Sequence, residues 1–79
     1  MKLTIEYYAQ LRDEAGCSKE IIETSCNNPA ALFAELDTRH GFSLAAAQLR
    51  VAINDEFANW DSPLADNDRL VFMPPMAGG

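Results

Sequence analysis

The sequence predicts a small α+β domain in which one mixed sheet is covered on one face by one main helix. Three observations support this prediction. Segments near both ends of the chain alternate apolar and polar residues, which is the pattern of a half-buried strand. A capped, amphipathic helix is indicated in the middle of the chain. The length of 79 residues is enough for one small core and one domain.

The N-terminal third is expected to form a strand, a short helix and a second strand. Residues 2–8 alternate between apolar and polar side chains and form the first expected strand. Residues 9–15 form the short helix, and Gly16 suits the left-handed conformation that often follows a helix. Residues 19–24 hold a pair of isoleucines and form the second strand, antiparallel to the first because the connection is short.

The central segment is expected to carry the main helix. Asn28 suits the cap position, and Pro29 suits the first helical position because an N–H there has no partner within the helix. An apolar stripe follows at helical spacing, and Gly41 is expected to end the helix. The Ala-rich residues 42–48 are expected to add one looser helical turn.

The C-terminal third is expected to form three strands. Residues 49–53 alternate again, Asn54-Asp55 is a hairpin signal, and residues 57–60 form the returning strand. Residues 69–73 form the final strand. The expected core combines apolar side chains of the strands and the main helix: Leu3, Ile5, Leu32, Leu36, Val51, Ile53, Leu70 and Phe72.

This order of elements is that of the ubiquitin-like β-grasp, in which the first and last strands are parallel neighbours at the centre of the sheet. We therefore expect a β-grasp domain over residues 1–73 and an extended tail over residues 74–79. In that fold Tyr8 and Met73 lie together on the face that the helix leaves open, and Phe57 lies beside them. Three exposed apolar side chains near the root of the tail predict a surface that binds a partner protein.

Composition excludes several classes of function. Twelve acidic against six basic side chains give a formal charge of -6, which argues against binding nucleic acid or an anionic membrane. Met1 and Lys2 lead directly into the first strand, so we expect no signal peptide and a cytoplasmic protein. Cys17, Cys26 and His40 are too few for a structural zinc site, and no permanently bound cofactor is expected.

The last six residues predict a reactive tail. They are Pro74, Pro75, Met76, Ala77, Gly78 and Gly79. A proline pair donates no hydrogen bond to a sheet and favours an extended conformation, so the tail reaches about 20 Å beyond the domain. Its two terminal glycines fit a channel too narrow for a Cβ atom. The carboxylate at its end is the expected reactive group.

Both ends of the chain resemble a known family. Residues 69–79 resemble the C-terminus of the small-subunit family of molybdopterin synthase, and residues 7–16 resemble that family's aromatic-Ala-x-hydrophobic-Arg-x-x-x-Gly opening. Residues 52–54 and 61–68 also resemble the corresponding segments of that family. The resemblance spans nearly the whole chain, although residues 17–48 match only in pattern.

The resemblance implies a sulfur carrier that is itself non-catalytic. A ubiquitin-activating-like adenylyltransferase would use ATP to adenylate Gly79, and sulfur from a persulfide donor would displace AMP to leave a thiocarboxylate. A large catalytic subunit would accept the tail, and two such sulfur transfers to a cyclic pyranopterin monophosphate would complete the dithiolene of molybdopterin. The family forms a heterotetramer of two large and two small subunits.

Three other functions share these features. A sulfur carrier of the thiamine pathway also ends in Gly-Gly on a β-grasp, although such chains generally lack the Pro-Pro pair. A ubiquitin-like modifier that is joined to target lysines shares the activation step. A plain interaction module with an inert tail is the third alternative.

Overall fold

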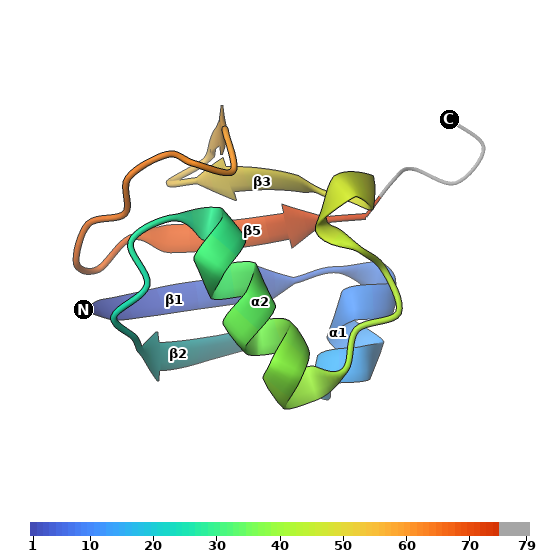
Figure 1. The fold of residues 1–79 in the computed structure, drawn as a ribbon. Helices are drawn as coiled ribbons and strands as arrows, with labels where there is room; N and C mark the ends of the chain where they lie inside the picture. The colour runs from blue at the N-terminus through green and yellow to red at the C-terminus, as the bar shows by residue number, and fades with distance from the viewer. Residues whose placement is uncertain (75–79) are drawn as a thin grey trace.

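The computed structural model describes residues 1–74 and shows one sheet with helix α2 packed across one of its faces (Figure 1). The elements are, in order, β1 (Lys2–Tyr7), α1 (Ala9–Ala15), β2 (Lys19–Glu23), α2 (Pro29–His40), the 3-10 turn η1 (Ala46–Gln48), β3 (Arg50–Ile53), β4 (Glu56–Ala58) and β5 (Arg69–Met73). The tail residues Pro75, Met76, Ala77, Gly78 and Gly79 lie outside the described residues.

The strand order confirms the predicted ubiquitin-like β-grasp. The five strands are arranged β2-β1-β5-β3-β4, so the first and last strands are central neighbours. β1 pairs parallel to β5 and antiparallel to β2, while β3 pairs antiparallel to both β5 and β4. A mixed sheet with a single parallel pair at its centre is therefore the frame of the domain.

Helix α2 forms where its local signals predict. The side chain of Asn28 accepts a hydrogen bond of 2.8 Å from the backbone N–H of Ala31, which satisfies one of the free donors of the first turn. Gly41 ends the helix with φ at 71°, a left-handed conformation that glycine adopts without steric cost. The expected extra turn at residues 42–48 is shorter than predicted, because only η1 is helical there.

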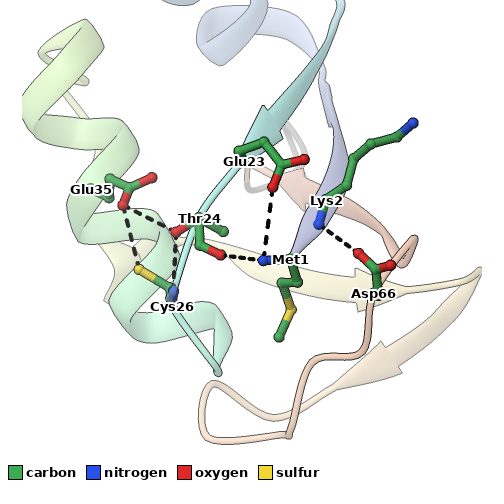
Figure 2. A network of polar contacts seen from close by, with 7 residues as sticks. All are labelled: Met1, Lys2, Glu23, Thr24, Cys26, Glu35 and Asp66. Carbon is green, nitrogen blue, oxygen red and sulfur yellow. Dashed lines mark hydrogen bonds and ion pairs between the residues drawn. The ribbon is translucent and has the colours of Figure 1, made fainter.

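A polar network joins the end of β2 to α2 and to the start of β1 (Figure 2). The hydroxyl of Thr24 donates to Oε1 of Glu35 at 3.1 Å, and the amino group of Met1 donates to the carbonyl of Thr24 at 2.7 Å. Cys26 is a free thiol whose sulfur lies 3.6 Å from the same Glu35 oxygen. The network fixes the helix layer against the edge of the sheet.

The core lies between α2 and the inner face of the sheet, and it contains seven of the eight predicted residues. Ile53 is the exception: it is half-buried and packs against the core from its margin, because β3 ends there and the hairpin turn follows. The buried cluster also includes side chains that the prediction did not place in it: Tyr7, Leu11, Ile22, Phe33, Leu49 and Leu64.

The β3–β4 hairpin has the predicted two-residue turn, but β4 is shorter than the expected strand 57–60. Asn54 and Asp55 both have positive φ, 52° and 73°, as a tight hairpin turn of this type requires. The chain leaves the sheet after Ala58, and Trp60 folds back to stack on Phe72 with ring centroids 5.8 Å apart. Trp60 thus covers the core instead of continuing the strand.

None of the helices described between residues 1 and 74 has the length and apolar character that crossing a membrane requires.

The buried stripe of α2 makes a direct stability prediction. Leu36→Ala is expected to lower the free energy of unfolding by about 2–5 kcal/mol, because Leu36 is fully buried and its truncation leaves a cavity. Urea denaturation followed by Trp60 fluorescence measures the loss. Ile21→Ala is the control, since Ile21 is 63% exposed and its truncation should cost less than about 1 kcal/mol. A comparable loss for the two variants would contradict the assignment of the stripe.

Candidate functional site

A shallow depression lies on the face of the sheet that α2 leaves open. It measures about 230 Å³ and opens widely to solvent. Its lining comes from the end of β1, the β3–β4 hairpin and β5: Tyr8, Ala52, Asp55, Phe57, Arg69, Val71 and Met73. All three side chains that the sequence predicts for a partner surface, Tyr8, Phe57 and Met73, are therefore brought together here.

Strand register explains why these side chains meet. Ala52 lies opposite Phe57 on one side and opposite Val71 on the other, so the three side chains form one row across β4, β3 and β5. In the parallel pair β1–β5, Tyr7 lies opposite Phe72. The residues that follow, Tyr8 and Met73, therefore lie next to each other and turn to the outer face.

The depression has a buried apolar floor and an exposed apolar rim. Ala52 and Val71 are each only 7% exposed, whereas Tyr8 is 50% and Phe57 is 64% exposed. Met73 is half-buried between floor and rim, and the half-buried Pro74 follows it directly. The predicted tail thus starts at the edge of the depression. Large apolar side chains left in water at a concave surface are typical of a protein-binding site.

Charged side chains line one end of the depression, and sequence reasoning did not identify them. Arg69 donates to Glu6 at 2.7 Å and to Asp55, and these hydrogen bonds, the one to Glu6 foremost, raise the pKa of Arg69 above its ordinary value. Toward the other end of the depression, outside its lining, Arg50 lies opposite Met73, and its guanidinium lies 4.0 Å from the ring centre of Phe57, within cation–π range. The alternation of β5 was the available signal, since it places Arg69 on the same face as Met73.

On the inner face, Tyr7 anchors the end of β1 and thereby directs Tyr8 outward. Its hydroxyl donates to Oε2 of Glu20 at 2.5 Å, and its ring packs edge-on against His40 and at a tilt against Phe42. Burial, reinforced by this hydrogen bond, raises the pKa of Tyr7. His40, which the sequence placed only near a helix end, lies 2.8 Å from the same Glu20 oxygen.

Among residues 1–74, no group of three or more His, Cys, Asp or Glu side chains gathers closely enough to hold a metal ion. What this part of the chain offers is a shaped apolar surface with a charged end. The predicted reactive group, the carboxylate of Gly79, lies outside the described residues, and so do the other predicted tail residues Pro75, Met76, Ala77 and Gly78.

Comparisons with known proteins match one family model and agree on the fold. The ThiS family model matches residues 5–79. The molybdopterin synthase sulfur carrier subunit of Escherichia coli (strain K12) is 28% identical over 80 residues, which cover 98% of this chain and 99% of that protein. A putative molybdopterin converting factor subunit 1 from Pyrococcus furiosus has a TM-score of 0.81 and 27% identity, over 96% of this chain and 99% of that one.

A structure of subunits 1 and 2 of the molybdopterin-converting factor from Helicobacter pylori, solved as a protein–protein complex, contains a chain of the same fold. Its TM-score is 0.70 at 24% identity, and the match covers 100% of both chains.

The Tyr7 anchor makes a pH-dependent prediction. Burial acts to raise the pKa of Glu20, but hydrogen bonds from Tyr7 and His40 outweigh it and hold that pKa below its ordinary value. A carboxyl whose pKa is depressed on folding stabilises the fold above its unfolded pKa, and this stabilisation is lost as the pH falls through the folded pKa. Tyr7→Phe removes one donor and should cost about 1–3 kcal/mol at neutral pH.

Urea denaturation of Tyr7→Phe and of the natural sequence at pH 7 and pH 3 tests this pH dependence. The difference in unfolding free energy between the two proteins should be smaller at pH 3 than at pH 7. Tyr8→Phe, at the exposed neighbour, is the control and should change stability little at either pH. A difference in unfolding free energy that grows on acidification would contradict the stabilising role of the Glu20 carboxylate.

Proposed function

The chain belongs to the ThiS family, and from that premise we propose that it is the sulfur carrier subunit of a molybdopterin synthase. One observation carries the proposal: the apolar depression formed by Tyr8, Phe57 and Met73 adjoins the root of a tail that ends in Gly78-Gly79. A docking surface beside a reactive tail is the arrangement that a carrier needs. Similarity to a sulfur carrier subunit along nearly the full length of both proteins supports the choice.

The tail supplies a carboxylate that must be activated before it can accept sulfur. A carboxylate resists nucleophiles because it is already negative. An adenylyltransferase that consumes ATP joins the carboxylate of Gly79 to AMP and releases pyrophosphate, so that AMP becomes a good leaving group. The outer sulfur of a persulfide donor then attacks the acyl carbon and displaces AMP, which leaves an acyl disulfide. A thiol reductant cleaves the S–S bond of this acyl disulfide and releases the thiocarboxylate. Gly79 has no side chain to obstruct either attack.

The resulting thiocarboxylate delivers its sulfur in the active site of a large catalytic subunit. The acceptor is a cyclic pyranopterin monophosphate, and two deliveries complete the dithiolene of molybdopterin. In this scheme the chain binds no permanent cofactor, and ATP is used by the activating enzyme. The acid–base groups for each step belong to the partner enzymes, while this chain contributes the carried carboxyl group and the surface that positions it.

The large subunit docks on the depression. Tyr8 and Phe57 lose their exposed surface on binding, and Met73 and Pro74 continue the contact into the tail. The Helicobacter pylori chain of the same fold, solved together with subunit 2 of its converting factor, supports a partner of this kind. Two large and two small subunits form the proposed assembly.

A sulfur carrier of the thiamine pathway is the second candidate, because the matching family model covers residues 5–79 without separating the two acceptors. Both functions need the same thiocarboxylate. A reconstituted transfer assay distinguishes the two functions. In one reaction the thiocarboxylated chain is mixed with a molybdopterin synthase large subunit and the pterin precursor, and in a parallel reaction it is mixed with a thiazole-forming enzyme. Product in the first reaction alone supports our proposal, and product in the second alone supports the alternative.

The docking surface makes a binding prediction. Met73→Glu should leave the fold intact and weaken binding to the large subunit by about tenfold to 100-fold, because it places an unpaired charge in a buried contact. Ile21→Glu is the matched control: Ile21 is exposed on the same face of the sheet but lies on β2, outside the depression. Titration calorimetry with the cognate large subunit gives both affinities. Equal affinities for the two variants would remove Met73 from the interface.

The tail makes a chemical prediction. One residue added after Gly79 moves the carboxylate by up to about 3.5 Å, and a displacement of about 1 Å already costs on the order of a hundredfold in rate. The extension should abolish thiocarboxylate formation, and deletion of Gly79 should be as severe. Gly78→Val should slow transfer by crowding the channel while the carboxyl chemistry persists.

The assay for these tail variants is sulfur transfer to the pterin precursor with purified carrier, activating enzyme and large subunit. Thermal unfolding serves as the control and should be unchanged, because the predicted core lies within residues 1–73. Near-normal product from the extended chain would show that the terminal carboxyl is not the carrier site.

A further inference from the structure

The outer edge of β2 is an open sheet edge. β2 is the first strand in the sheet order and pairs only with β1 (Figure 1). Its five residues, Lys19–Glu23, form a longer edge than the three residues of β4 on the opposite side. An open edge of this kind is a template for pairing with another strand.

The hydrogen bonds at the two ends of the β1–β2 pair show which groups of β2 face outward. The N–H of Tyr7 donates to the carbonyl of Ser18, and the N–H of Thr24 donates to the carbonyl of Met1, both at 3.0 Å. Antiparallel ladders alternate, so the even-numbered residues of β2 bond to β1. Lys19, Ile21 and Glu23 therefore direct their N–H and C=O groups away from the sheet.

The hydrogen bonds of β1 independently support the assignment of Ile21 as a residue whose backbone groups face outward. Thr4 lies opposite Ile21, and its N–H donates to the carbonyl of Asp68 on the other side of β1, at 3.0 Å. Thr4 therefore uses its donor toward the C-terminal segment, which leaves Thr4 and Ile21 as a pair without mutual hydrogen bonds.

The side chains along this edge are free for contact. Ile21 is 63% exposed and lies outside the depression described above. Lys19 and Glu23 are also exposed, and the Glu23 carboxylate, 78% exposed, lies 3.9 Å from the amino group of Met1 (Figure 2). The edge thus presents a positive charge, an apolar centre and a negative charge in order.

That order is self-complementary, and we propose that β2 pairs with β2 of a second copy of this chain, antiparallel and centred on Ile21. In this register the two Ile21 side chains lie opposite each other, and Lys19 of each copy lies opposite Glu23 of the other. Opposite charges at facing positions stabilise antiparallel pairs. The two Ile21 residues exchange both of their outward backbone hydrogen bonds, as a two-fold axis through this pair requires.

The proposed pairing is weak and leaves the docking surface free. A single strand pair buries less than the roughly 1,200–2,000 Å² of a stable interface, so the dimer forms at high concentration. The depression lies over β5, β3 and β4, whereas the proposed pairing uses the outer edge of β2, at the opposite side of the sheet from β4. The proposal therefore does not depend on the proposed function, and each copy in the dimer keeps its own depression.

A charge-exchange experiment tests the pairing. Lys19→Glu and Glu23→Lys each place like charges at both facing positions. Each should raise the dimer dissociation constant by about tenfold, measured by sedimentation velocity at about 0.15 M ionic strength. An equimolar mixture of the two variants restores opposite charges at both positions and should recover a dimer of one copy of each. The double variant should dimerise like the natural sequence.

Two further variants control for general effects. Ile21→Pro removes the outward N–H without touching the bonds to β1, so it should abolish dimers while circular dichroism and thermal unfolding report a folded monomer. Glu56→Lys, on the opposite edge, changes the net charge as Glu23→Lys does and should leave dimerisation unchanged or slightly stronger. A natural sequence that stays monomeric up to about 1 mM, or single variants that fail to associate on mixing, would overturn the proposal.

Discussion

The parallel pairing of β1 with β5 is the constraint on which the rest of the molecule depends. It joins residues more than 60 positions apart in the chain, with Thr4 opposite Arg69 and Tyr7 opposite Phe72. Because the two strands run in the same direction, both end at the same side of the domain. Tyr8 therefore emerges beside Met73, and the tail begins at the rim of the depression.

Strand alternation then separates stability from binding. Tyr7 and Phe72 point inward, where they pack against α2 and its neighbours, and both are almost fully buried. Their neighbours Tyr8 and Met73 point outward, where they line the depression. One register thus determines which side chains lie on each face of the sheet. A side chain on the outer face is therefore expected to be replaceable without loss of the fold, whereas one on the inner face is not.

Local signals made most of the fold predictable from the sequence. Asn28 and Gly41 define the ends of α2 through their own backbone chemistry, so its bounds needed no tertiary information. The predicted strand 57–60 extended too far at its C-terminal end, because Trp60 lies outside the sheet and stacks on Phe72. No local pattern encodes that contact. Arg69 was missed for a related reason, since its role depends on Glu6, 63 positions away, and on Asp55.

The central claim is that the chain carries sulfur on its terminal carboxyl group, and intact-mass spectrometry of the protein from its native cells tests it most directly. We predict a species heavier by the difference between one sulfur and one oxygen atom, with fragmentation placing the change at Gly79. Treatment with an alkylating reagent should label that species at its C-terminus. A chain found only at its unmodified mass in cells that are making molybdopterin, or only as a conjugate to lysines of other proteins, would contradict the claim.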